Sequence, residues 1–519
     1  MVGEMLLLLV GLLFLEGSWS SISPMPEGRQ EVGVVATEGR IYVIGGLTIA
    51  GTASNRVDVF DTHSGSWLPG PPLPIATHHP MVTALGHKIY LAGGYTDPGF
   101  FAHRQVYELD PDRSAWTRLA DMPTPRGAGA AVSYGGRIYV FGGERDGLTV
   151  NEVASYDPIT NAWSTLPPMP TPRNHHGAAL VGSRIYLIGG RPGNQSTNEE
   201  FDVTTQMWRA RSSLPTGRSG IAVAAVGEHV FVFGGEGNAS SPLGTFNENE
   251  SYDPGADAWT AQPPMPLPRH GIGAGVVGNR IYIPAGGPIA GFGVTQESDF
   301  FEVAEDILLP QFVVGSGYRS EIVVSNPASR PAEVVLSVFD ISGAPLVTQL
   351  DGASRASLTF TIPPLASRTI SAPDSSGALR AGTVRIHANV RINAFAIIRI
   401  SGAPASTVYP VTPSRNAVFH VRLNRSDQTN TGVAVANTSL QSQAVTLALI
   451  SEAGVELARI ERTLAAGAQL AGFISELFTS IPQGDFSGTM TVRAAQTVSA
   501  VAIAFSRDGV VTIPVSAIE

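Results

Sequence analysis

The chain has no cysteine and a single lysine, Lys88, among its 519 residues. Without cysteine it can form no disulfide, no thiolate metal site and no cysteine nucleophile. The other 32 of its 33 basic residues are arginines, a bias that suggests a GC-rich bacterial genome. One lysine leaves almost no room for Schiff-base chemistry.

Positive charge is also scarce in the first part of the chain. Residues 1–305 contain 18 basic and 29 acidic side chains, whereas residues 306–519 contain 15 and 14. An acidic surface repels a phosphate backbone, so we expect no nucleic-acid partner.

No apolar run is long enough to span a bilayer. The run from Met5 to Leu15 has eleven residues, which is the length of the apolar part of a secretory signal peptide. We therefore expect residues 1–17 to be a signal peptide and the protein to be secreted, periplasmic or on the cell surface. The segment before this run lacks Lys and Arg, so a buried strand or a misassigned start is the alternative.

Glycine, proline and tandem repeats are abundant. The 57 glycines and 38 prolines are typical of a turn-rich, all-β protein. All six tryptophans recur at one repeated position, and each is followed 26 or 27 residues later by a Gly-Gly pair. The tryptophans are Trp19, Trp67, Trp116, Trp163, Trp208 and Trp259, and the last Gly-Gly pair is Gly286-Gly287. The period of 45 to 52 residues suits one four-stranded propeller blade.

The third repeat shows the internal pattern most clearly. An apolar run, Arg137-Ile-Tyr-Val-Phe-Gly-Gly143, predicts a strand that stops at glycines. Tyr156-Asp157, then Trp163, then Pro-Met-Pro-x-x-Arg173 follow, and a large indole can fill the wedge between blades. This combination resembles the kelch repeat family over residues 18–305 and implies a β-propeller.

The last repeat lacks its tryptophan strand. No tryptophan follows Asp299-Phe-Phe-Glu-Val303, but Ser18-Trp19 precedes the first Gly-Gly pair by the usual spacing. We therefore predict a six-bladed propeller over residues 18–305, closed by the Trp19 strand. Such closure removes open sheet edges.

A second internal repeat occupies the rest of the chain. Ser320-Glu-Ile-Val-Val-Ser-Asn326 is echoed by Thr431-Gly-Val-Ala-Val-Ala-Asn437, an offset of 111 residues. Alternating apolar residues predict strands with one solvated face. We expect two β-sandwich domains, residues 306–412 and 413–519, that are similar to immunoglobulin-like modules but lack their Cys and Trp marks.

Function should lie where the blades differ. An arginine ten residues after each tryptophan recurs in five blades, with Thr77 in the other, and we interpret it as architectural. Two residues later the blades carry Glu31, His79, Ala128, His175, Gly220 and Gly271, and the loops after the Gly-Gly pairs also vary. The kelch resemblance implies that these two loop sets share one face around the central channel. The expected ligand-binding rim is His79, Tyr95, Glu144, Arg145, His175, His176, Arg191, Glu236 and His270.

We expect no metal and no cofactor. The pairs His78-His79 and His175-His176 could each give one ligand, because adjacent strand residues point to opposite faces. Together with Glu144 they could form a three-ligand set. The kelch-type copper radical oxidases need a cysteine joined to a tyrosine, which this chain lacks.

The preferred interpretation is a non-enzymatic, monomeric binding protein whose propeller face recognises a protein or glycan ligand, with the sandwiches as spacers or adhesion modules. The alternative is a carbohydrate enzyme of the sugar mutarotase or epimerase type, suggested by the resemblance to bacterial six-bladed kelch proteins. That chemistry needs an acid and a base, for instance Glu144 or Glu236 with His175.

Overall fold

The structure, a computed structural model, describes residues 17–519 except 97–99, 329, 374–376, 391, 401–405, 409–413, 425, 427–428, 439–441, 479–484, 507–508, 514–515 and 518–519. The expected signal peptide lies almost entirely outside the described residues. The described chain forms two compact units, residues 17–303 and residues 304–519. In the described part no helix is long and apolar enough to cross a membrane.

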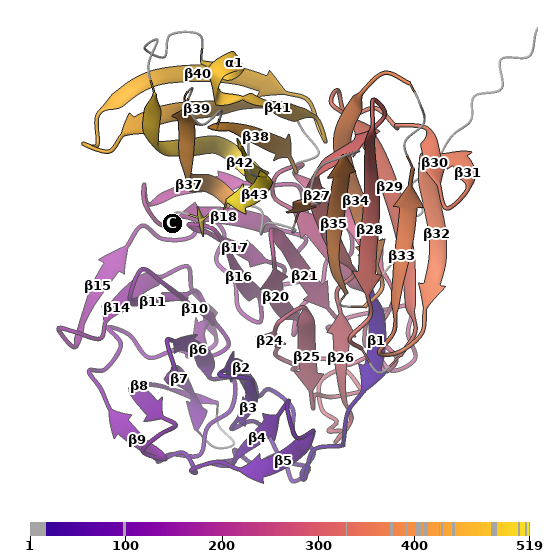
Figure 1. Cartoon of the computed structure of the whole chain (residues 1–519). Coiled ribbons are helices and arrows are strands. Elements are labelled where there is room, and N and C mark those ends of the chain that lie inside the picture. Colours follow the sequence, from indigo (N-terminus) through magenta and orange to yellow (C-terminus); the bar gives the residue numbers. More distant parts are fainter. Residues whose placement is uncertain are drawn as a thin grey trace, which may run out of the picture. The chain divides into compact units, whose positions relative to one another are not determined.

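The first unit is a propeller of six four-stranded antiparallel sheets, with the first strand of each sheet nearest the axis (Figure 1). Second strands such as β11 (Arg137–Phe141) are buried on both faces, because each blade packs between two others.

The first three blades are β2 (Gly33–Thr37), β3 (Arg40–Ile44), β4 (Val57–Asp61) and β5 (Ser66–Pro69); β6 (Met81–Leu85), β7 (Lys88–Thr96), β8 (Phe101–Asp110) and β9 (Ala115–Arg118); and β10 (Ala130–Tyr134), β11, β14 (Val153–Asp157) and β15 (Ala162–Leu166). The hairpin of β12 (Glu144–Arg145) and β13 (Leu148–Thr149) belongs to the third repeat. The next two blades are β16 (Gly177–Val181), β17 (Arg184–Ile188), β18 (Asn198–Asp202) and β19 (Met207–Ala210), then β20 (Ala222–Val226), β21 (His229–Phe233), β22 (Asn249–Asp253) and β23 (Ala258–Gln262).

The sixth blade takes its outer strand from the start of the described chain. Its strands are β24 (Gly275–Val277), β25 (Arg280–Pro284), β26 (Ser298–Glu302) and β1 (Ser18–Ser21), and Trp19 lies opposite Phe301 in the antiparallel pair β1–β26. The two ends of the propeller sequence are thus joined by a strand ladder, as the missing sixth tryptophan strand indicated.

The tryptophans connect neighbouring blades. Every indole Nε1–H donates to a backbone carbonyl of the preceding blade, at 2.8 to 3.2 Å; the acceptors of Trp19, Trp67, Trp116, Trp163, Trp208 and Trp259 are Pro263, Ser23, Pro71, Ala120, Pro167 and Ser212. The indoles are only partly buried, because they stand on the outermost strands. They act as hydrogen-bonded wedges rather than as core residues.

The Gly-Gly pairs adopt left-handed backbone angles in five blades, for example φ 60° at Gly93 and 120° at Gly94. A Cβ on Gly93 would lie 2.3 Å from the carbonyl oxygen of Arg126 in the next blade, so the close approach requires glycine. In the sixth blade the structural counterpart is Ala285 with Gly286, at φ 62° and 100°, rather than Gly286-Gly287. The spacing of 26 residues from tryptophan is therefore kept with a strained alanine in the turn.

In the second unit, residues 305–408 form two four-stranded sheets around one apolar core. The sheets are β27 (Glu305–Val314), β34 (Arg380–Ala388), β29 (Ala332–Asp340) and β32 (Ser357–Ile362), and β33 (Ser367–Ala372), β28 (Tyr318–Ser325), β35 (Asn393–Ile400) and β36 (Ser406–Val408). A small hairpin, β30 (Thr348–Leu350) with β31 (Ala353–Arg355), lies beside them.

Residues 414–517 repeat this strand order within a single sheet. Its elements are β40 (Glu456–Leu464), β39 (Gln443–Ser451), β42 (Phe486–Ser506), β37 (Ser414–Asn424), β38 (Thr429–Asn437), β41 (Gln469–Phe473), β43 (Gly509–Ile513), β44 (Ser516–Ala517) and the short helix α1 (Ile474–Leu477). The 21-residue β42 takes the places of both β34 and β35: its first half pairs with β39 and β37, and its second half with β38 and β43. The all-β fold, a kelch-type propeller followed by β-sheet regions, is confirmed.

Candidate functional site

The two variable loop sets lie together, as the kelch resemblance implied. The residue after each repeated arginine position forms an antiparallel bridge with the residue after the Gly-Gly turn of the same blade. The bridges are Gln30 with Leu47, His78 with Tyr95, Gly127 with Glu144, Asn174 with Arg191, Ser219 with Glu236, and His270 with Gly287. In each blade the bridge therefore brings the variable residue that follows it, two positions after the repeated arginine, close to the variable loop after the Gly-Gly turn.

A closed ring of backbone hydrogen bonds joins the next residue of every blade. We call the six residues Glu31, His79, Ala128, His175, Gly220 and Gly271 the axial ring. Each N–H donates to the carbonyl of the ring residue in the preceding blade, with N···O distances between 2.7 and 3.1 Å. The ring holds its six side-chain positions in a fixed arrangement around the axis.

The axial ring requires left-handed backbone, with φ between 51° and 66° at all six positions. Glycine adopts this conformation freely, as Gly220 and Gly271 do, whereas other residues are destabilised there by on the order of 1–2 kcal/mol. Glu31, His79 and His175 therefore hold reactive side chains at a conformational cost. Strain of this kind is found preferentially at functional sites.

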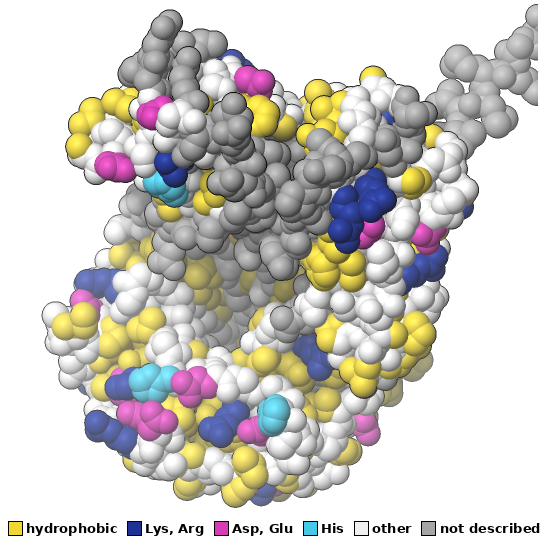
Figure 2. Space-filling model, viewed as in Figure 1, with side chains coloured by type: hydrophobic (Ala, Val, Ile, Leu, Met, Phe, Trp, Pro, Cys, Tyr) yellow, Lys and Arg dark blue, Asp and Glu magenta, His cyan; other side chains and the backbone are white. Residues whose placement is uncertain are grey.

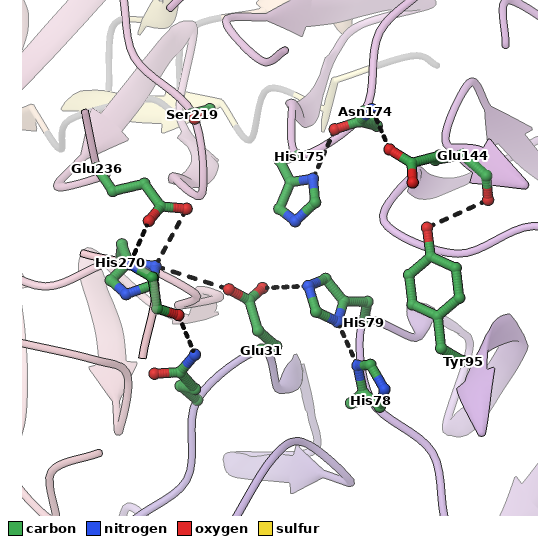
Figure 3. Close-up of polar contacts among 12 residues, drawn as sticks. Glu31, His78, His79, Tyr95, Glu144, Asn174, His175, Ser219, Glu236 and His270 are labelled. Atoms are coloured by element: carbon green, nitrogen blue, oxygen red, sulfur yellow. Dashed lines mark hydrogen bonds and ion pairs between the residues drawn. The ribbon is translucent and has the colours of Figure 1, made fainter. Parts of the chain in front are cut away.

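These three side chains converge (Figure 3). His79 Nε2 lies 3.1 Å from a carboxyl oxygen of Glu31, and the rings of His79 and His175 meet edge to face with centroids 4.9 Å apart. His79 Nδ1 lies 2.5 Å from Nδ1 of His78. Because His79 has positive φ, the two adjacent rings touch instead of pointing to opposite faces.

His175 is oriented by a chain of polar contacts. Asn174 donates from its amide nitrogen to Glu144 Oε2 at 2.9 Å and to Thr149 Oγ1 at 2.7 Å. Its amide oxygen, 2.6 Å from His175 Nδ1, is thus an acceptor, and Nδ1 carries the proton. Nε2 is the unprotonated nitrogen, and it points toward Glu31 and His79 (Figure 3).

Two further ionisable groups, His270 and Glu236, lie on the other side of Glu31. His270 Nδ1 lies 3.4 Å from Glu236 and 3.6 Å from the second oxygen of Glu31, while its Nε2 donates to the carbonyl of Ile289 at 2.9 Å. Glu236 pairs with Arg191 and accepts from the backbone N–H of Gly291 at 2.8 Å. We call Glu31, His79, His175, Arg191, Glu236 and His270 the axial site.

Burial separates the protonation behaviour of these groups. It raises the pKa of Glu31 and lowers the pKa of His79 to about 3. The pKa of His175 also falls well below its usual value through burial and the neighbouring His79. Burial opposes the shifts of the other pair, but their mutual contact raises the pKa of His270 and, with Arg191, lowers that of Glu236 to about 2.

Two expected rim residues lie elsewhere. His176 is 5% exposed and sits three residues after the repeated arginine, where other blades have Val32, Ile221 and Ile272. It is a packing residue, because the chain turns it into the blade. Arg145 pairs with Glu152 at 2.6 Å, outside the axial site. Tyr95 and Glu144 flank the site, where the Tyr95 hydroxyl donates to the Glu144 carbonyl at 3.2 Å.

Glu31 is the central residue that the expected rim omitted. It contacts both His79 and His270. It occupies the same repeat position as His79 and His175, whereas most of the expected rim residues come from the loops after the Gly-Gly pairs. Its signal was present in the sequence: Glu31 and His79 occupy the one variable position that is glycine in two blades. Asn174 was also missed, because its role depends on the orientation of an amide.

The repeated arginines are architectural. All five are at most 1% exposed, and each pairs with one carboxylate; the pairs are Arg29 with Asp58, Arg126 with Glu152, Arg173 with Glu199, Arg218 with Glu250, and Arg269 with Asp299. In the second blade Thr77 replaces the arginine, and its hydroxyl contacts His103 Nε2 at 3.0 Å.

Exposed aromatic and charged groups surround the site. Phe100 is 53% exposed. The centroid of its ring lies 4.8 Å from that of His78, 5.5 Å from that of Tyr95 and 5.8 Å from that of His79. Arg191 is 40% exposed. On the face in Figure 2, basic and acidic side chains of the described propeller residues are interspersed.

Comparison with known proteins identifies the repeats. A solved structure described as "Structure of YjhT" is similar at 15% sequence identity, covers 54% of this chain and 96% of that chain, and has a TM-score of 0.45. A search of curated proteins found no match. A family model described as the KLHDC2/KLHL20/DRC7 Kelch-repeats domain matches residues 14–190 and 78–287. These overlapping matches together span residues 14–287, more than half of the chain, and the protein therefore belongs to the kelch-repeat family.

Proposed function

We propose that the protein binds a polar ligand, with a glycan as the first candidate, at the axial site of its propeller. The observation that carries the proposal is the convergence of Glu31, His79 and His175 from three blades, each in a left-handed backbone conformation that glycine relieves elsewhere in the ring. A purely structural ring would gain stability from glycine at these positions.

The surroundings fit a sugar better than a flat protein surface. Phe100 is an exposed aromatic residue in contact with His78, His79 and Tyr95, and Arg191 is a partly exposed donor of the axial site. Ligand sites commonly combine an aromatic wall with a few fixed polar groups. A peptide segment with polar side chains is the other occupant of the binding proposal.

A screen of neutral and acidic monosaccharides and short oligosaccharides against the full chain, by ligand-observed NMR, tests the proposal. For a sugar that binds, Phe100→Ala and Arg191→Ala should each weaken affinity by about 1–2 kcal/mol. Ile159→Ala is the control, because Ile159 is an exposed apolar residue, at 93%, in the turn between β14 and β15 and outside the axial site. Equal affinity of all three variants would place the ligand elsewhere.

A second candidate is catalysis of sugar anomer exchange or epimerisation. It is favoured by a carboxyl group and two imidazoles whose donor atoms lie within 4.8 Å of one another. Glu236, held ionised by Arg191 and His270, is not suited to donate a proton, so Glu31 replaces it as the candidate acid. An NMR exchange assay on any sugar that binds separates a binder from an enzyme.

We also propose export, on the apolar run Met5–Leu15 alone. Terminal sequencing of the mature protein from its native host checks it. A mature protein that retains residue 1 would contradict export by a cleaved signal.

A further inference from the structure

We propose that Glu31, His79 and His175 bind one zinc ion. A carboxylate oxygen of Glu31 and one ring nitrogen from each histidine lie within 4.8 Å of one another, although the three residues come from three different blades. Two imidazoles and one carboxylate are a common ligand set for zinc, and they leave a fourth position for water or a polar ligand.

The distances suit a compact ion. Ligand bonds of 2.0 to 2.1 Å in a tetrahedral shell place neighbouring donor atoms about 3.4 Å apart. The Glu31 and His79 donors already lie 3.1 Å apart. Moving the His175 ring nitrogen onto the same ion needs a side-chain shift on the order of 1 Å.

The residues behind the ligands support the assignment. Asn174, itself fixed by Glu144 and Thr149, accepts a hydrogen bond from Nδ1–H of His175 and leaves Nε2 as a lone-pair donor aimed at Glu31 and His79. Among the described residues none donates a hydrogen bond to that nitrogen. His78 Nδ1 lies 2.5 Å from the rear nitrogen of His79, Nδ1, where it can accept a hydrogen bond from that ring when Nε2 binds a metal ion. Hydrogen bonds of this kind set the tautomer of metal-binding histidines.

The backbone holds the three ligands rigidly. All three belong to the axial ring, with φ of 51° to 52° and hydrogen bonds to both neighbouring blades. The neighbouring set of Glu31, Glu236 and His270 is less suitable, because Arg191 and the Gly291 N–H already occupy the two oxygens of Glu236.

Zinc titration of the full, untagged chain tests this site without any sugar. Protein stripped with EDTA is titrated with Zn²⁺ by calorimetry, and with Co²⁺ by visible absorption. We expect one ion per chain and a four-coordinate Co²⁺ spectrum. Asn174→Ala, which removes the positioning residue, should weaken zinc binding about 10- to 100-fold.

His175→Gly and Glu31→Gln should abolish the site. His175→Gly installs the residue that Gly220 and Gly271 already provide in the ring, so the metal-free variant should keep its melting temperature. His87→Ala is the matched control, since His87, Asp110 and Asp112 form a separate, more exposed cluster. Unchanged stoichiometry in a folded His175→Gly variant, or loss of binding in His87→Ala, would overturn the proposal. A chain that binds zinc but no sugar would support the zinc site and contradict the proposed glycan binding. A chain that binds a sugar but no zinc would contradict the zinc site alone.

Discussion

Single arginines hold five of the six blades together. Arg173, for example, is fully buried and donates to the carbonyls of Leu187, Gly189 and Thr197 as well as to Glu199. A buried cation is tolerated here because carbonyl dipoles and one carboxylate replace its water shell. Removing it leaves Glu199 buried without its charged partner.

We therefore expect Arg173→Ala to lower the free energy of unfolding by about 3–5 kcal/mol. The control is Arg137→Ala, whose side chain is 44% exposed in its pair with Asp157 and which should change stability by less than about 1 kcal/mol. Chemical denaturation of both variants measures the difference. Similar losses in the two variants would show that the repeated arginines are not architectural.

Glu236 makes a residue-scale prediction about pH. Its pKa is about 2 in the folded chain, below the value of about 4.3 for a free glutamate, so its ionised form stabilises the fold above pH 5 or so. This contribution is lost as pH falls toward 2. Compared with Glu236→Gln, the wild type should be more stable at pH 7 by on the order of 2–3 kcal/mol, and the gap should close in acid. A gap that stays constant between pH 7 and pH 3 would argue against the shifted pKa.

At the scale of elements, the strand β1 decides whether the sheet of the sixth blade is complete. Trp19 is its main contact: the indole lies 5.2 Å from Phe301 and 5.6 Å from Phe233, and its N–H binds the carbonyl of Pro263. Loss of the indole weakens the contact between the fifth and sixth blades. If β1 then detaches, the edge of β26 is left unpaired.

Trp19→Ala should destabilise the propeller by about 2–3 kcal/mol, less than a fully buried tryptophan would, because the indole is partly exposed. Trp19→Phe, which keeps an aromatic ring but lacks the N–H donor, should lose about 1 kcal/mol. Thermal unfolding with limited proteolysis reports both. Full stability of the alanine variant would mean that the β1 ladder alone closes the ring.

At the scale of the whole molecule, each compact unit has its own cores. Residues 17–303 contain six complete sheets, and residues 304–519 contain two copies of one strand order. Units with complete cores of this size usually fold alone.

The fragment 17–303 should therefore be soluble and unfold cooperatively, and so should 304–519. Calorimetry of each fragment beside the full chain gives the comparison. A fragment 17–303 that aggregates or is digested throughout by protease would show that its stability depends on the other unit.

The propeller was predictable because its signals are local and repeated. Spacing of tryptophans and glycines gives the number of blades and even the closing strand. Spacing cannot show which side chains converge, so Glu31 was left out of the rim and His176 was included. Comparing His176 with Val32, Ile221 and Ile272 at the same repeat position would have marked it as a packing residue. No sequence signal predicts that β42 is one long strand where the first copy has the two strands β34 and β35. Alternation of apolar residues has the same pattern in one long strand as in two shorter ones.

The axial ring is built only from main-chain atoms, and its hydrogen bonds do not depend on which side chains it carries. Any residue that tolerates a left-handed backbone can therefore occupy one of the six positions without loss of the main-chain hydrogen bonds. Glu31, His79 and His175 occupy three positions, while Ala128, Gly220 and Gly271 leave three nearly bare. The chemical groups at the axis can thus be changed by exchanging single residues, while the tryptophan contacts and buried arginines preserve the fold.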